Sequence, residues 1–259
     1  MLFRSSLPAP ETTVVSRFIR EDDDARSTWG STWLSATACL GSVTYDCTWT
    51  QRRPVLAYFQ TAKGTAVLRL RLLRDGHDCA SGGLRTAQDG RRLLVAAQLL
   101  TDRGDHHIHL DRPADGRFTF ADLRLRWELS GGEARVVDAQ PTRVVLAAGE
   151  WSARLHLAGA RSGDRFPVWE VGREDGRAWV DLVLRREASP VSRAFGDWGP
   201  AYAVMGLELH GNGAFAGFTD AGPTCNSDAS RVRGTWGRLT VAVPLQPGTF
   251  GAVRDAGCQ

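Results

Sequence analysis

Apolar and polar residues alternate with a period of two over several stretches of this chain, and this alternation limits what it can fold into. In residues 66–73, for example, Leu68 and Leu70 alternate with Arg69 and Arg71. Successive side chains of a β-strand point to opposite faces of the sheet, so the pattern indicates strands with one apolar and one polar face. No window of helical length keeps a 3.6-residue period between a cap and a stop. The chain is therefore predicted to be all-β.

The same alternation recurs in 122–129 and in 150–157. The second of these stretches places two sets of side chains on opposite faces: Trp151, Ala153, Leu155 and Leu157 against Ser152, Arg154 and His156. Dipeptides that contain glycine separate such stretches. They predict hairpin turns, because glycine tolerates the positive φ that tight turns require. Gly131-Gly132 follows the first stretch, and Ala148-Gly149 precedes the second.

The turn residues divide the chain into roughly fifteen strand candidates with few long connections, as is typical of a large antiparallel β-sandwich. We expect a supersandwich-like fold with little helix. A single domain is expected over residues 1–259, with irregular tails at 1–11 and 246–259. The expected interruptions are long segments without regular strands, which in compact domains are often functional: 20–35, 187–200 and 219–235.

Composition excludes several classes of protein. Hydrophobic residues make up 42% of the chain and charged residues 24%, with a net charge of +3, so a soluble globular domain can bury a core without metal or disulfides. The arginines are mixed with acids along the strands, whereas nucleic-acid binders concentrate their cations, so no nucleic acid is expected as a partner. No apolar run has the length of a membrane span, and residues 1–10 contain no apolar run of signal-peptide length. Neither the localisation nor any export follows from the sequence.

The five cysteines follow no C-x-x-C spacing, so neither a zinc ribbon nor a redox motif is present. Two alternatives stay open for them. In an oxidising compartment Cys39 can pair with Cys47 across a hairpin. In a reducing or buried setting all five are free thiols.

The most unusual run of the sequence is Asp105-His106-His107-Ile108-His109-Leu110-Asp111. If the run is extended, Asp105, His107, His109 and Asp111 share one face. His107, His109 and Asp111 then form a candidate ligand set for a divalent metal such as zinc. Alternatively, His107 beside Asp105 is a candidate catalytic pair for proton transfer. The third alternative is a solvated strand end with histidine–carboxylate hydrogen bonds only.

A second candidate site combines an indole, an amide and two guanidinium groups: Trp49, Gln51, Arg52 and Arg53. An indole face stacks on the apolar face of a pyranose, and guanidinium groups bind carboxylate or sulfate, so this set suits an acidic sugar. The alternative is that Trp49 packs in the core while the arginines pair with acids. Trp29 and Trp33 are expected in a loop, where exposure is more common.

Eight segments of the chain carry a resemblance to a known family: Leu40-Gly41-Ser42, the run from Trp49 to Pro54, Tyr58-Phe59, Arg69-Leu70-Arg71, Leu84 to Gln88, Gly104 to His107, Leu110 to Pro113 and Asp122-Leu123-Arg124. Together these segments are similar to the C-terminal β-sandwich half of bacterial heparinase II/III-type polysaccharide lyases. The resemblance implies a sandwich that braces a cleft formed with an α/α-toroid domain, where Tyr and His act in β-elimination beside a uronic acid. Some members of that family bind a structural zinc in the sandwich. No helical half is expected in this chain, so a toroid domain or subunit is an implied partner.

Three hypotheses for function follow. The first is a carbohydrate-associated module, the non-helical half of a lyase-type system, that recognises an acidic polysaccharide or oligosaccharide. The second is a self-sufficient polysaccharide lyase or glycoside hydrolase of β-sandwich fold. The third is a β domain that binds a ligand other than sugar or serves a structural role. No nucleophile elbow, H-E-x-x-H, P-loop or dinucleotide fingerprint occurs in the sequence.

Overall fold

The chain folds as an all-β antiparallel sandwich, as the sequence predicts. A computed structural model describes residues 11–20, 23–43, 54–79, 81–101, 116–211 and 221–256. Within them the strands form three antiparallel sheets of nine, six and three strands, which is eighteen strands where roughly fifteen were expected.

Strands that are neighbours in a sheet are often distant in the sequence, so the order within each sheet differs from the chain order. The nine-stranded sheet contains β1 (Thr12–Arg20), β2 (Asp23–Leu34), β3 (Ala38–Val43), β4 (Val55–Thr61), β5 (Gly64–Arg74), β9 (Arg117–Ser130), β14 (Arg177–Ala194) and β13 (Trp169–Glu174), with β6 (His77–Asp78) paired to β5. The six-stranded sheet contains β10 (Arg135–Gln140), β11 (Arg143–Ala148), β12 (Trp151–Ser162), β15 (Ala201–His210), β8 (Arg92–Leu99) and β7 (Gly82–Asp89). The three-stranded sheet contains β16 (Thr224–Ser227), β17 (Arg231–Trp236) and β18 (Leu239–Pro244), and the helical elements are η1 (Phe195–Asp197) and α1 (Phe250–Ala256).

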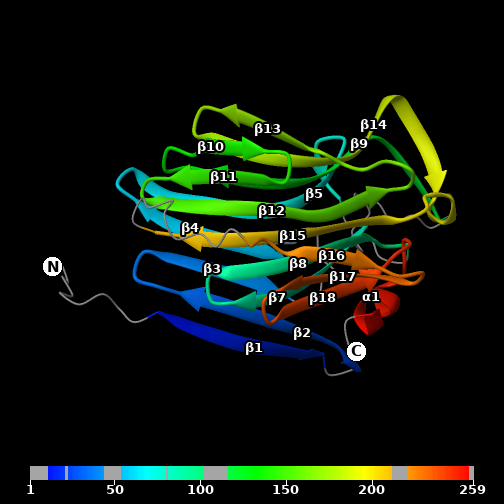
Figure 1. The fold of residues 1–259 in the computed structure, drawn as a ribbon, viewed down its shortest axis with the longest axis horizontal. Coiled ribbons are helices and arrows are strands. Elements are labelled where there is room, and N and C mark those ends of the chain that lie inside the picture. The colour runs from blue at the N-terminus through cyan, green and yellow to red at the C-terminus, as the bar shows by residue number, and fades with distance from the viewer. Residues whose placement is uncertain are drawn as a thin grey trace.

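The three sheets form three layers. Figure 1 shows the six-stranded sheet in front of the nine-stranded sheet, with the strands of both running in nearly the same direction. This is the aligned packing that twisted sheets adopt face to face. The three-stranded sheet and α1 cover part of the outer face of the six-stranded sheet, where β17 and β18 contact β8. The six-stranded sheet is therefore the middle layer.

The middle layer contributes to two hydrophobic cores. On β8, Leu93 and Val95 belong to the core shared with the nine-stranded sheet, and Leu94 and Ala96 belong to the core shared with the three-stranded sheet. Because a strand alternates its side chains between faces, a strand buried on both sides reads as a continuous apolar run, and Arg92–Leu99 has this character. The second core also contains Trp236 from β17.

Four segments that were expected to be irregular contain regular elements. Residues 23–34 form β2, and Trp33 is 2% exposed rather than in a loop, with its indole edge packed on Trp151 at 6.0 Å between ring centres. Most of 187–200 continues β14 as far as Ala194, and most of the described part of 219–235 forms β16 and β17. The tail expected over 246–259 includes the helix α1. The extension of β14 pairs with β9, which is distant in the sequence, and Trp33 is buried by packing on Trp151, so tertiary contacts overrode the local composition at both places.

An aromatic pair joins the two large sheets. Phe59 on β4 is fully buried and lies face to face with Trp151 on β12, with ring centres 5.7 Å apart. We expect Phe59→Ala to lower the free energy of unfolding by about 3–5 kcal/mol, because the cavity loses contacts from both sheets. Urea unfolding measures the loss.

The matched control for this substitution is the preceding residue, Tyr58, which points to the opposite face and is 42% exposed. Tyr58→Ala should change the free energy of unfolding by about 0.5 kcal/mol or less. Equal losses for the two variants would contradict the placement of the core between the sheets.

Candidate functional site

Both candidate sites singled out in the sequence lie outside the residues that the structure describes. The first set is Trp49, Gln51, Arg52 and Arg53, and the second is Asp105, His107, His109 and Asp111. Their roles in sugar binding, catalysis and metal binding stay predictions. Among the described residues, no group of three or more His, Cys, Asp or Glu side chains is arranged to hold a metal ion. The thiols of Cys39 and Cys225 are free of disulfide bonds within the described residues, whereas Cys47 and Cys258 lie outside the described ranges.

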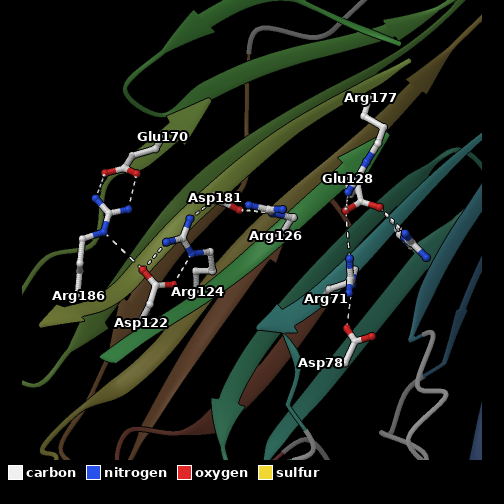
Figure 2. A network of polar contacts seen from close by, with 11 residues as sticks. Arg71, Asp78, Asp122, Arg124, Arg126, Glu128, Glu170, Arg177, Asp181 and Arg186 are labelled. Carbon is white, nitrogen blue, oxygen red and sulfur yellow. Dashed lines mark hydrogen bonds and ion pairs between the residues drawn. The ribbon is translucent and has the colours of Figure 1, made fainter. Parts of the chain in front are cut away.

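A network of ion pairs covers part of the outer face of the nine-stranded sheet (Figure 2). Glu128 on β9 is fully buried, and three arginines from two neighbouring strands converge on its carboxylate. Arg69 donates from Nε at 3.0 Å, Arg71 from Nη1 at 3.1 Å and Arg177 from Nη2 at 3.4 Å. Charge-assisted bonds of this kind compensate a buried carboxylate for the water it has lost.

Asp181 on β14 is the second buried anion of this network. Arg126 binds it through two nitrogens, at 2.7 and 2.8 Å, and Arg124 through a third at 2.7 Å. Arg124 also pairs with Asp122, which Arg186 approaches at 3.4 Å (Figure 2). The network thus neutralises its own charges along the sheet.

The protonation of Glu128 fits a structural role. Burial by itself would raise its pKa, but the hydrogen bond from Arg69 and the charges of Arg69, Arg71 and Arg177 outweigh burial, so the pKa lies below its ordinary value. Glu128 therefore stays ionised at neutral pH. The carboxylate oxygens are occupied by arginines of the same chain, so this face holds its sheet together and offers little charge to a ligand.

A second polar group lies on the outer face of the six-stranded sheet, where Arg92 pairs with Glu208 at 2.9 Å and Arg143 pairs with Asp138 of β10 at 3.2 Å. Cross-strand pairing places Arg143 opposite His156 and Arg154 opposite Glu208, with Glu208 in turn opposite Arg92. Directly opposed residues of antiparallel strands point to the same face. We name these five residues the His156 cluster. It holds three arginines and one carboxylate.

Residues distant in the sequence bury His156. Its ring packs edge-on against Trp236, with ring centres 5.2 Å apart. Gly206 lies opposite His156 on β15, and a Cβ at this position would come 2.8 Å from the indole of Trp236. A Cβ at Gly222 would come 2.8 Å from Nδ1 of His156, so only glycine lets this segment approach the imidazole so closely.

This environment keeps His156 neutral. Burial, followed by the charges of Arg154, Arg143 and Arg92, lowers the pKa of His156 from 6.5 to about 4. Its Nε2 atom is buried and has no hydrogen-bond partner among the described residues, and the same holds for Nε of Arg143. Buried polar atoms without a partner lower the stability of the fold. Nε2 of His156 and Nε of Arg143 are therefore candidates to bind a ligand.

An open pocket of about 460 Å³ lies beside the cluster. Such a volume is typical of small-molecule sites. The described side chains and backbone that line it are Gln140, Pro141, Thr142, Arg143, His156, Leu157, Gly222 and Pro223. A guanidinium, an amide, a hydroxyl and an imidazole therefore face the same space. This set can bind an anionic group together with neighbouring hydroxyls.

The chain matches no protein-family model, and neither a curated protein nor a solved structure is significantly similar to it. The resemblance to heparinase II/III-type sandwiches is therefore left without support or contradiction. None of the helices within the described residues has the length and apolar character needed to cross a bilayer.

The protonation of His156 can be tested by an NMR pH titration of the folded protein. We expect its imidazole resonance, assigned by its loss in His156→Gln, to titrate near pH 4. Because the folded pKa lies below the ordinary value of 6.5, the unfolded chain takes up the proton first. The free energy of unfolding should therefore decrease as the pH falls from about 6.5 toward 4, and decrease less in His156→Gln. A midpoint near 6.5 in the folded protein would contradict the burial described above.

Proposed function

We propose that this chain is a carbohydrate-associated β-sandwich module that binds the anionic group of an acidic polysaccharide or oligosaccharide in the pocket beside His156. The observation that carries the proposal is the convergence of Arg143 and neutral His156 on a single open pocket, with Arg154 and Arg92 adding positive charge behind it. A positively charged pocket raises the local concentration of anions.

The lining suits a uronate better than a bare inorganic anion. Arg143 can bind a carboxylate with two parallel hydrogen bonds, which is the geometry that a guanidinium favours. Gln140 and Thr142 offer an amide and a hydroxyl to sugar hydroxyls, and Leu157 and Pro223 offer an apolar surface to the carbon face of the ring. The side chain of Arg143 is 39% exposed and lines the pocket, so a ligand can reach its guanidinium, where Nη2 also pairs with Asp138 at 3.2 Å.

The low pKa of His156 favours binding over catalysis as the function of this pocket. A lyase needs a base that removes a proton from the uronate, and a general base works best with a pKa near the working pH. His156, with a pKa of about 4, is a weak base for that task. A self-sufficient lyase would instead use residues outside the described ranges, of which His107 and Asp105 are the candidates.

The proposal includes a helical partner, a toroid domain or subunit, and this part rests on the family resemblance alone. In such an arrangement the pocket would position an acidic chain whose cleavage depends on residues of the partner.

Arg143→Gln tests the proposal directly. A hydrogen bond to a charged group contributes about 1.5–3 kcal/mol, so this variant should bind uronate-containing oligosaccharides about tenfold more weakly or worse. Calorimetric titration measures the affinities of the wild type and the variant. Carboxyl-reduced oligosaccharides of the same length are the control ligands, and the wild type should bind them more weakly.

The matched control variant is Arg238→Gln, which removes an arginine of similar kind that pairs with Asp89 away from the pocket. Its affinity should equal that of the wild type. Unchanged affinity in Arg143→Gln, or failure of the wild type to bind any acidic glycan, would overturn the proposal. Unsaturated product absorbing in the ultraviolet, formed by the chain alone, would instead establish the lyase hypothesis.

A further inference from the structure

A bulge in the strand β10 places one carboxylate on the outer face of the six-stranded sheet. The register between β10 and β11 shifts between Val136 and Asp138, so Val137 is an extra residue. Asp138 therefore opposes Val145, whereas a continuous register would set it against Val144. Directly opposed residues share a face, and Val144 belongs to the core between the two large sheets. The bulge thus turns Asp138 away from that core, as bulges beside functional sites often do.

The carboxylate of Asp138 holds two side chains of the pocket beside His156. Oδ1 accepts a hydrogen bond from Nε2 of Gln140 at 3.1 Å, and Oδ2 accepts one from Nη2 of Arg143 at 3.2 Å. Gln140 and Arg143 both line the pocket, whereas Asp138 is not among the described residues that line it. Asp138 therefore lies behind the two donors that a ligand would meet.

Asp138 carries a negative charge at neutral pH. The hydrogen bond from Gln140, together with the hydrogen bond and charge of Arg143, outweighs the effect of burial and lowers the pKa of Asp138 below its ordinary value. A charged acceptor forms stronger hydrogen bonds than a neutral one. Asp138 therefore restrains two long side chains that would otherwise rotate in solvent.

This restraint and the charge of Asp138 have opposite effects on an anion in the pocket. The charge repels the anion, but an exposed ion pair changes an affinity by about fivefold at most. The restraint removes the cost of ordering Gln140 and Arg143 on binding, which is about twofold to tenfold in affinity for each long side chain. Because two side chains are held, the restraint outweighs the repulsion.

We propose that Asp138 is a positioning residue of the pocket, which presents the amide of Gln140 and the guanidinium of Arg143 to the carboxylate and neighbouring hydroxyls of a uronate. This inference rests on the function proposed above. It adds that the affinity depends on a carboxylate that does not itself touch the ligand.

Calorimetric titration with uronate-containing oligosaccharides compares two variants that lose the same charge. Asp138→Ala removes both acceptor oxygens and should bind about fivefold to tenfold more weakly than the wild type. Asp138→Asn keeps the shape and one acceptor oxygen, so its loss should be about twofold to threefold. The difference between the variants measures positioning, because repulsion is removed equally in both.

The matched control variant is Asp89→Asn. It removes an exposed carboxylate that also pairs with an arginine, Arg238, but away from the pocket. Its affinity should equal that of the wild type.

NMR relaxation of the free protein tests the restraint without any ligand. In the wild type, the side-chain amide of Gln140 and the Nε–H group of Arg143 should show heteronuclear NOE values of restrained groups. Both values should fall in Asp138→Ala, while the backbone amides of β10 and β11 keep theirs. Unchanged backbone values separate a loss of positioning from a loss of the hairpin.

Tighter or unchanged binding by Asp138→Ala would overturn this inference and leave the proposed function intact. Weaker binding without increased mobility of Gln140 and Arg143 would overturn it as well, since Asp138 would then act in another way. A wild type that binds no acidic glycan would overturn the proposed function, and this inference with it.

Discussion

Apolar burial on both faces of the six-stranded sheet holds the three layers together. On β15, Met205 and Leu207 face the nine-stranded sheet while Val204 faces the three-stranded sheet. A strand of the middle layer is covered on both faces, so its polar side chains do not reach solvent. Polar side chains on the same outer face, such as Glu208 and His156, are buried because the third layer covers their neighbours. The candidate site is thus a consequence of the layer order.

The two polar faces of the molecule differ in how their charges are satisfied. On the nine-stranded sheet, Glu128 and Asp181 each accept hydrogen bonds from two or more arginines, so burial of the carboxylates is compensated. In the His156 cluster, Arg92 pairs with Glu208 and Arg143 with Asp138, but Nε2 of His156 and Nε of Arg143 have no partner within the described structure. Removing water from such groups costs about 1–3 kcal/mol each. A bound anion would offset this cost, which is why we assign function to the second face and structure to the first.

The local sequence pattern predicted most of the strands and their hairpins. It did not predict that a three-stranded sheet covers the six-stranded sheet. Alternation placed Arg154 and His156 on one face, and the glycine turns at Gly131-Gly132 and Ala148-Gly149 join strands as expected. The third layer escaped prediction because β16 and β17 lie in a stretch rich in Gly, Ser and Asp. The pocket escaped prediction because the segment at Gly222 meets the β11–β12 hairpin only through tertiary packing. Trp33 was predicted at the surface because the acidic run before it is typical of a loop.

Amide hydrogen exchange of the native protein, followed by mass spectrometry, tests the double burial of the middle layer most directly. Exchange of core amides requires the layers to open, whereas terminal strands open locally. The account predicts that β8 and β15 exchange slowest of the described strands and β1 among the fastest. Exchange of β8 and β15 as rapid as that of β1 would mean that the third layer does not pack on the six-stranded sheet, and the buried site beside His156 would not exist.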